Sequence, residues 1–220
     1  MGYGIKIRVT GDYALFTRPE MKVERVSYDT MTPSAARGII EAVYWKPAIR
    51  WIIDRIRVLN PIEFTNVRRN EVSSKTSTHE AQRRMNGTTE PFYIDAGADR
   101  QQRAAMVLKN VDYIIEAHFE LTDRAGPDDT VEKHYNMALR RFRKGQYHHA
   151  PALGAREFGA QVTIIEAEDE TPASALTGNL DLGWMLYDMD YSDPLDIKPR
   201  FFRAELRDGI MDLQSVEVLR

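Results

Sequence analysis

The chain has 220 residues, a formal net charge of −3 and 43% apolar residues, enough for one large domain or two small ones. It contains no cysteine, which excludes disulfides, thiolate metal ligands and cysteine nucleophiles. No apolar run approaches the roughly 20 residues of a membrane span. The first residues also lack the pattern of a secretory signal. We therefore predict a soluble, cytoplasmic protein.

The charge is unevenly distributed along the chain. Residues 1–110 contain 18 Lys/Arg and 12 Asp/Glu, a balance of +6, whereas residues 111–220 contain 12 and 21, a balance of −9. A basic half beside an acidic half suggests that one surface faces an anion and another faces different partners. The same imbalance occurs in proteins that bind no nucleic acid, so composition alone leaves both interpretations open.

The first elements in chain order are a strand, a helix and a second strand. Residues 4–16 alternate and are rich in β-forming residues, which predicts a strand. Thr32 and Pro33 are typical of a helix start, with Thr32 as the N-cap and Pro33 at the first helical position, and Pro47 ends the helix. Residues 49–59 alternate charged and apolar residues in their second half and predict the next strand.

A polar stretch follows. Residues 66–99 are rich in arginine and have almost no apolar period. They predict a long basic insertion, about residues 66–104 in full, of a kind that is usually functional or disordered. Residues 105–122 return to strand character, and residues 128–145 predict a helix with an acidic first turn and a basic last turn. Residues 158–166 predict another strand.

The order of elements is therefore β-α-β, a long insertion, and β-α-β. This order predicts an α+β, ferredoxin-like fold, the topology that also underlies the RRM-like RNA-recognition domain, although the short aromatic signature of that domain is not evident. We assign residues 1–166 to this domain. Residues 167–220 contain an acidic linker followed by β-like runs, and we predict that they form a small C-terminal antiparallel β appendage.

The most unusual segment is Arg140–Phe158, with the sequence RRFRKGQYHHAPALGAREF. Four cations within five residues lead into a glycine, a tyrosine and two histidines. A basic helix end that opens into such a loop is suited to a polyanion. A solvated basic helix face followed by an ordinary turn is the alternative, and this segment by itself does not separate the two.

Three blocks of the chain resemble conserved blocks of one protein family, in the family's order. The first is residues 32–47, TPSAARGIIEAVYWKP. The second consists of RR at 140–141, KGQ at 144–146 and PALGAREF at 151–158, and the third is GWMLYDMDY at 183–191. Together they resemble a CRISPR-associated protein, the subtype I-C member of the Cascade family that caps the 5′ end of the guide RNA.

The resemblance implies a metal-independent endoribonuclease without a cofactor. Such a protein cleaves precursor CRISPR RNA within each repeat, stays on the crRNA 5′ handle, and assembles with the backbone and large subunits of type I-C Cascade. The resemblance further implies catalysis by a Tyr, a Lys and a His. Tyr44 fits the tyrosine and His118 fits the histidine, whereas Ala117 occupies the expected lysine position. Lys46 and Lys109 are candidates for the missing cation by their place in the sequence.

Metal-free RNA cleavage uses the 2′-hydroxyl to attack the adjacent phosphorus and leaves a 2′,3′-cyclic phosphate and a 5′-hydroxyl. His118 suits proton transfer because the ordinary pKa of histidine is about 6.5. Tyr44 can position the 2′-hydroxyl or relay a proton, but an ordinary pKa of roughly 10 makes it a poor base. The structural alternatives are a Tyr44 ring packed on the sheet and a half-buried, satisfied His118.

RNA binding is predicted for the cations of the insertion, of the first helix and of the basic segment, together with the adjoining rings. These residues are Arg37, Arg68, Arg69, Arg83, Arg84, Arg140, Arg141, Arg143, Lys144, Tyr147, His148 and His149. Arginine and lysine suit phosphate contacts, and Tyr147 and Phe92 are candidates for stacking on unpaired bases. Any single member of this set is equally well explained as a solvated charge or a surface ring.

Two other functions stay open. One is a crRNA-binding structural subunit of the same complex that does not cleave, and the absence of the expected lysine favours it. The other is a small-molecule enzyme or regulator on a ferredoxin-like scaffold. That function predicts no tight RNA binding and does not account for the basic insertion.

Overall fold

The computed structural model describes residues 3–21, 23–87 and 93–219. The strands are β1 (Gly4–Ala14), β2 (Arg25–Val26), β3 (Ile49–Val58), β4 (Phe64–Val72), β5 (Arg100–Leu121), β6 (Gln161–Ile164), β7 (Asn179–Asp190), β8 (Lys198–Arg207) and β9 (Ile210–Asp212). The helices are α1 (Pro33–Val43), α2 (Thr78–Met85) and α3 (Val131–Arg143). Phe92, predicted above to stack on a base, lies outside the described residues.

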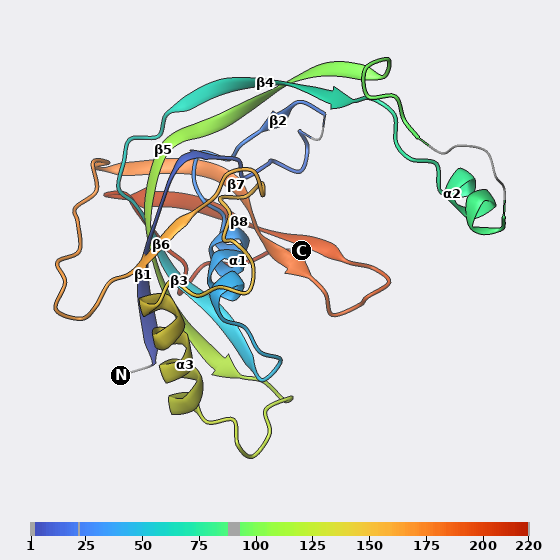
Figure 1. Ribbon diagram of the computed structural model, residues 1–220. Coiled ribbons are helices and arrows are strands. Elements are labelled where there is room, and N and C mark those ends of the chain that lie inside the picture. Colours follow the sequence, from blue (N-terminus) through green and yellow to red (C-terminus); the bar gives the residue numbers. More distant parts are fainter. Residues whose placement is uncertain (1–2, 22, 88–92, 220) are drawn as a thin grey trace.

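One large sheet organises the molecule (Figure 1). Within the described ranges it contains nine strands, in the order β6-β1-β5-β3-β9-β8-β7, with β2 and β4 also paired to β5. The pairs are antiparallel except for β2 with β5. The fold is thus mixed α and β with few helices. None of the helices described is long and apolar enough to cross a membrane.

Helix α1 begins where the sequence predicts. Thr32 is the N-cap, its hydroxyl accepts a backbone N–H, and Pro33 occupies the first turn, where it leaves no hydrogen bond unmade. The helix ends at Val43 because Tyr44 adopts an extended conformation, with φ −148° and ψ 117°. The predicted end at Pro47 is therefore wrong by one helical turn, and Tyr44 is a cap residue instead of a helix residue.

The core lies between the sheet and helices α1 and α3. In β1, Ile5, Ile7 and Val9 are buried while Lys6 and Arg8 lie on the opposite face, as strand alternation requires. Burial of one such side chain stabilises the fold by roughly 1.5–3 kcal/mol. This alternation decides which residues of each strand can reach solvent.

The predicted insertion is not a structureless loop. β4 pairs with the first part of β5 from Phe64 opposite Leu108 to Val72 opposite Arg100. The two strands form an arm that projects from the sheet and carries α2 at its tip (Figure 1). The sequence hides this ribbon because no residue of β4 is fully buried, so it shows no alternation of apolar and polar residues.

The C-terminal residues are antiparallel strands, as predicted, but they are not a separate appendage. β9 pairs with β3, with Ile56 opposite Met211, and this joins the β7–β8 hairpin to the main sheet. Met185 and Phe202 enter the same hydrophobic core as the N-terminal strands. The predicted strand at 158–166 is shorter than expected and contains only residues 161–164.

Candidate functional site

His118 lies on β5, on the sheet face opposite the helices. Its neighbours Ala117 and Phe119 are buried in the core, so strand alternation turns His118 away from it. The His118 side chain is 36% exposed, and its Nδ1 lies 2.9 Å from Oδ2 of Asp54. When Nδ1–H donates to this carboxylate, the unprotonated Nε2 can accept a proton from a substrate.

The contact between His118 and Asp54 depends on an irregularity in β3. The pairing register of β3 with β5 shifts between Ile53 and Arg55, so Asp54 is an extra residue on its strand. Such a bulge re-aims side chains that would otherwise alternate. Asp54 consequently reaches His118, while its neighbour Arg55 reaches Glu116 on the same face, at 3.7 Å.

Most cations on this face are already paired with carboxylates. The pairs are Arg8 with Asp112 at 2.6 Å, Arg50 with Glu120 at 2.9 Å, Arg55 with Asp212 at 2.9 Å and Arg57 with Glu116 at 2.9 Å. Lys6 differs: its Nζ donates to Thr171 Oγ1 at 3.1 Å, and no carboxylate partner occurs in the described part of the chain. The strand partner of His118 is Gly4, two residues before Lys6, so Lys6 is its diagonal neighbour.

The two lysines named from the sequence are poorly placed. Lys109 pairs with Glu63 at 3.0 Å and lies nine positions from His118 along β5, roughly 30 Å at 3.3 Å per residue. Lys46 is exposed in the turn after α1, and no contact between it and His118 is present among the residues described. A position one before the histidine would in any case face the core, where Ala117 is buried.

Tyr44 does not share a site with His118. It is 1% exposed, and its hydroxyl lies 2.7 Å from Nδ1 of His134. The His134 ring also contacts the ring of Phe119, with 6.3 Å between centroids, and Phe119 faces the core. Tyr44 and His118 therefore lie on opposite faces of the sheet. Burial raises the pKa of Tyr44, which keeps its phenol protonated at neutral pH.

The sequence predicted no role for His134, which proves to be the partner of Tyr44. It is 2% exposed, and its Nε2 lies 3.1 Å from Oδ1 of Asp129. When Nε2–H donates to Asp129, Nδ1 accepts the Tyr44 hydroxyl, so each member of this buried chain is satisfied. Helical spacing could have indicated that His134 is buried, because it lies on the same face of α3 as the buried residues Ala138 and Phe142.

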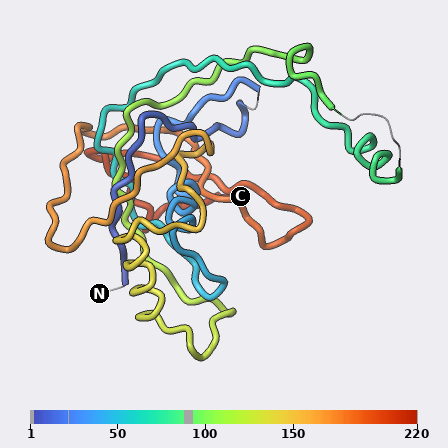
Figure 2. The backbone as a smooth tube through the Cα atoms, viewed as in Figure 1, coloured from blue at the N-terminus to red at the C-terminus, as the bar shows by residue number. Residues whose placement is uncertain are grey.

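The basic end of α3 lies against the end of α1. Arg141 donates to the Val43 carbonyl at 2.9 Å, and its guanidinium carbon lies 5.6 Å from the Tyr44 ring centroid. The His148 N–H donates to the Ala42 carbonyl at 2.7 Å. The chain that follows α3 thus returns alongside α1, which Figure 2 shows in yellow and blue.

The predicted RNA-binding cations fall into two groups. In the first, the charge is paired: Arg37 with Asp188, Arg69 with Glu157, Arg83 and Arg84 with Glu80, and Arg143 with Glu166. The second group has no carboxylate partner within the described ranges: Arg68, Arg140, Arg141 and Lys144. Arg156, which the prediction omitted, belongs to the second group. Tyr147, His148 and His149 are exposed.

These residues occupy two regions. Arg68, Arg69, Arg83 and Arg84 lie on the arm, whereas Arg140, Arg141, Arg143 and Lys144 lie at the end of α3. Arg37 lies on α1, and Arg156 lies in the segment between α3 and β6. The segment after α3 connects the regions, because Glu157 pairs with Arg69 and the Arg69 guanidinium carbon lies 5.7 Å from the Phe158 ring centroid.

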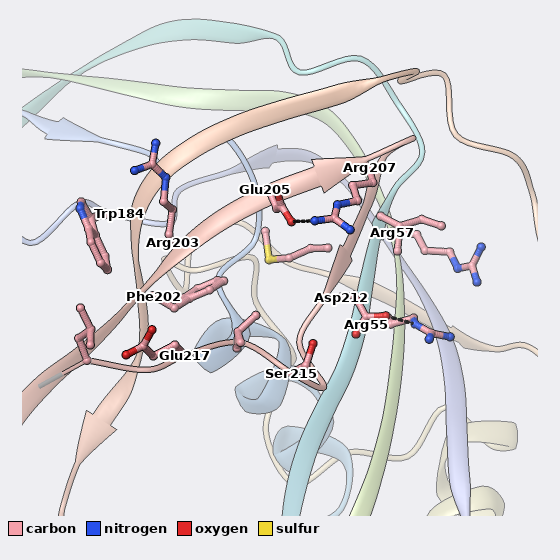
Figure 3. Close-up of a pocket in the computed structure, with 14 residues that line it drawn as sticks. Arg55, Arg57, Trp184, Phe202, Arg203, Glu205, Arg207, Asp212, Ser215 and Glu217 are labelled. Carbon is pink, nitrogen blue, oxygen red and sulfur yellow. Dashed lines mark hydrogen bonds and ion pairs between the residues drawn. The ribbon is translucent and has the colours of Figure 1, made fainter.

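A hollow of about 700 Å³ lies among β3, β8, β9 and the last described residues (Figure 3). Its charged lining residues are Arg55, Arg57, Arg203, Arg207, Glu205, Asp212 and Glu217. Arg55 is bonded to Asp212 and Arg207 to Glu205, and both pairs are drawn in Figure 3. Charges that alternate and pair in this way give little net attraction for a phosphate, so we do not assign this hollow to RNA.

The chain is similar to known proteins over most of its length. Residues 4–214 match the family described as CRISPR-associated protein (Cas_Cas5). Over 217 residues the chain is 50% identical to "CRISPR pre-crRNA endoribonuclease Cas5d" of Mannheimia succiniciproducens, covering 97% of this chain and 96% of that protein. It is 40% identical over 228 residues to the protein of the same name from Thermus thermophilus, covering 96% and 91%.

Solved structures show the same fold. A structure described as "Crystal Structure of CRISPR-associated Protein" matches with a TM-score of 0.70 and 26% identity, over 97% of this chain and 93% of that chain. A chain of a "CRISPR RNA-guided surveillance complex" matches with a TM-score of 0.51, over 98% and 89%. At 13% identity, this second likeness concerns the fold alone.

Proposed function

The chain belongs to the CRISPR-associated protein (Cas_Cas5) family, and on that premise we propose that it is an endoribonuclease of precursor CRISPR RNA. It cleaves within the repeat, stays bound to the 5′ handle and assembles with the other subunits of a type I-C Cascade complex. The observation that carries this proposal is the 50% identity, over 97% of the chain, to a protein named as a pre-crRNA endoribonuclease.

A ferredoxin-like domain over residues 1–166 is part of the proposal. β1, α1, β3, β5, α3 and β6 follow the order β-α-β-β-α-β, and their strands lie side by side as β6-β1-β5-β3. In this description the arm is the insertion at about residues 66–104. Residues 167–220 form a C-terminal unit that extends the same sheet.

His118 is the residue that we assign to proton transfer. The 2′-oxygen forms a bond to phosphorus as the bond from phosphorus to the 5′-oxygen breaks. Nε2 of His118 accepts the proton of the 2′-hydroxyl, while Asp54 holds Nδ1–H and stabilises the imidazolium that forms. A water molecule supplies the proton to the leaving 5′-oxygen.

Lys6 is the cation that we assign to charge stabilisation in place of the absent lysine. Diagonal neighbours across an antiparallel pair lie about 7–8 Å apart, within reach of a lysine side chain. Lys6 occupies this position relative to His118 on the same sheet face, and it has no carboxylate partner in the described part of the chain. It can therefore stabilise charge on the phosphorane without first breaking an ion pair.

Tyr44 remains a predicted catalytic residue. Its hydroxyl is hydrogen-bonded to Nδ1 of His134, and its side chain has almost no exposed surface. A direct role therefore requires α1 and α3 to separate at this contact. A role through packing requires no movement, because Tyr44 contacts Arg141, which lies at the basic end of α3.

A crRNA-binding subunit without nuclease activity is the second candidate. The specific observations in its favour are Ala117 at the expected lysine position and the separation of Tyr44 from His118 by the sheet.

The test is incubation of the purified protein with its cognate repeat RNA in EDTA. We expect cleavage with a 2′,3′-cyclic phosphate product, abolished both by His118→Ala and by a 2′-deoxy nucleotide at the cut. His79→Ala is the matched control, because His79 is exposed on α2, far along the arm. Tight binding without cleavage by the wild type would establish the second candidate instead.

A further inference from the structure

A groove runs along α1 beside the segment that follows α3. Two hollows of about 570 and 540 Å³ share Ala35 and Gly154 in their walls, so they adjoin each other along α1. Arg25 lines one end of the groove, and His149 and Arg156 line the other. The groove lies on the helix side of the sheet and is separate from the His118 site.

The wall opposite α1 is fixed at two places. At one, the His148 N–H donates to the Ala42 carbonyl at 2.7 Å. At the other, the Leu15 N–H donates to the Leu153 carbonyl at 3.0 Å. Gly154 has φ +83°, and a Cβ there would lie 2.0 Å from the Leu15 carbonyl oxygen. The fold thus requires glycine at 154, and the groove exists before any ligand binds.

Gly38 lies on the floor of the groove, and the fold does not require a glycine at this position. It sits in the middle of α1, where glycine is less favourable than alanine. A Cβ at Gly38 would have no atom within 4 Å beyond its chain neighbours and the helix's own backbone, so the protein leaves room for at least an alanine there. An unfavourable residue that the fold does not need is best explained by a ligand that must approach the helix closely.

The charges around the groove indicate the class of ligand. His149 and Arg156 line it and have no carboxylate partner in the described part of the chain. The carboxylate of Glu157 also lines it and is paired with Arg69. The ends of the groove also lead to the two basic regions. His149 follows the end of α3, with Arg140 and Lys144, and Arg25 is paired with Glu71 on the arm. A groove that joins two separated basic regions fits an extended polyanion better than a compact ligand.

We propose that the sugar-phosphate backbone of the bound CRISPR RNA lies in this groove, and that Gly38 leaves the room for it. The RNA passes over Gly38 between α1 and the side chains of His149 and Arg156. This inference rests on the proposed function, because the RNA is the substrate proposed above. It adds a path for the strand between the end of α3 and the arm.

The first test measures affinity for repeat RNA with Gly38→Ala, Gly38→Leu and Gly38→Glu. We expect Gly38→Leu to weaken binding about 10-fold or more, Gly38→Ala less, and Gly38→Glu most, because the last adds a like charge. Thermal stability should be unchanged or raised, since each is a better helix former than glycine. Gly159→Leu is the matched control: its Cβ also has free space, φ is not positive, and it does not line the groove.

A second measurement uses the absence of cysteine from the chain. Gly38→Cys introduces a single thiol on the groove floor, and Gly159→Cys introduces one outside it. We expect repeat RNA to slow maleimide modification of the Gly38→Cys protein about 10-fold or more and to leave the control unchanged. This measurement detects protection by RNA and does not depend on weakened binding. Its result is therefore valid even if the larger residues Leu and Glu disturb the helix at position 38.

The outcomes separate the two proposals. A wild type that binds no repeat RNA would contradict both the proposed function and the proposed RNA path. If the wild type binds and cleaves, Gly38→Leu has equal affinity and the thiol at 38 is not protected, the proposed RNA path through the groove is wrong. The proposed nuclease activity is then unaffected. Protection of that thiol by another Cascade subunit, but not by RNA, shows that the groove holds protein and likewise overturns the inference.

Discussion

The two faces of the sheet both carry cations, and they differ in what those cations contact. Opposite the helices, Arg8, Arg55 and Arg57 are paired with carboxylates of neighbouring strands. On the helix side, Arg140 and Arg156 have no acid partner in the part of the chain described. A phosphate must compete with a carboxylate for these three arginines but not for Arg140 or Arg156. The pairing of an arginine, more than its presence in the sequence, therefore indicates whether it is available to a phosphate.

The two histidine–aspartate pairs differ in a similar way. His118 with Asp54 and His134 with Asp129 have comparable contact distances, 2.9 Å and 3.1 Å. His118 has a side chain that is 36% exposed, whereas His134 is 2% exposed and bonded to Tyr44. The pair of His118 and Asp54 is thus accessible to a substrate. The pair of His134 and Asp129 is instead part of the contact between α3 and the end of α1.

The largest expected effect is on cleavage by His118→Ala. Loss of a general acid or base lowers a rate by about 10²–10⁴-fold. We expect a loss in this range in single-turnover cleavage, with RNA affinity unchanged. If His134→Ala, prepared at a temperature where it is folded, lowers the rate equally while His118→Ala does not, the assignment of the two pairs is reversed.

Lys6→Ala should give the next largest loss of rate. Removal of one group that stabilises charge at the reacting centre costs up to about 10²–10³-fold, and an exposed lysine should give roughly 10–100-fold. Lys6→Arg should restore part of the rate because the charge is kept. Arg8→Ala is the control, since Arg8 lies on the same face of β1 but is paired with Asp112. Equal losses in the two alanine variants would contradict a special role for Lys6.

His134→Ala should mainly lower stability. It leaves the buried Tyr44 hydroxyl with only the Met137 sulfur, a weak acceptor at 3.6 Å, and a poorly satisfied buried polar group costs about 1–3 kcal/mol. In a domain of this size, 1 kcal/mol corresponds to about 2–4 °C in Tm. The double variant Tyr44→Phe, His134→Ala should lose less than the sum of the single variants. Simple additivity in thermal unfolding would show that the two residues do not form a unit.

Arg140→Ala and Arg143→Ala compare an unpaired cation with a paired one on the same helix. Arg140 has no carboxylate partner within the described residues, whereas Arg143 pairs with Glu166 through two nitrogens. We expect Arg140→Ala to weaken RNA binding several-fold and to reduce the salt slope by about 1. Arg143→Ala should change affinity less. Identical salt slopes for the two variants would mean that the ion pair with Glu166 does not prevent Arg143 from contacting phosphate.

The smallest effect concerns pH and the pair Arg143–Glu166. Hydrogen bonds from Arg143 lower the pKa of Glu166. A lowered pKa in the folded state means that the contribution to stability is present above the ordinary glutamate range and is lost as the pH falls through the lowered value. The Tm difference between wild type and Arg143→Gln should therefore be small at pH 7 and shrink toward pH 3. A difference that grows on acidification would contradict this sign.

Local patterns in the sequence were sufficient for much of the fold. Thr32 and Pro33 marked the start of α1, and the alternation in residues 4–16 and 49–59 placed two central strands. The arm was missed because polar residues occupy both of its faces, so its strands have no apolar period. The bulge at Asp54 was missed because nothing local distinguishes it from the rest of its strand.

The sequence by itself determined the composition of the candidate site: the histidine at 118, the basic segment Arg140–Phe158, and the family that the chain resembles. The tertiary structure decided which residues meet. The contact between Tyr44 and His134 joins positions 90 residues apart, and that between Arg57 and Glu116 joins positions 59 apart. Periodicity tells which face of an element a residue occupies, but not what the opposite element places there. For that reason the sequence predicted neither the burial of Tyr44 against His134 nor the pairing of Arg57 with Glu116.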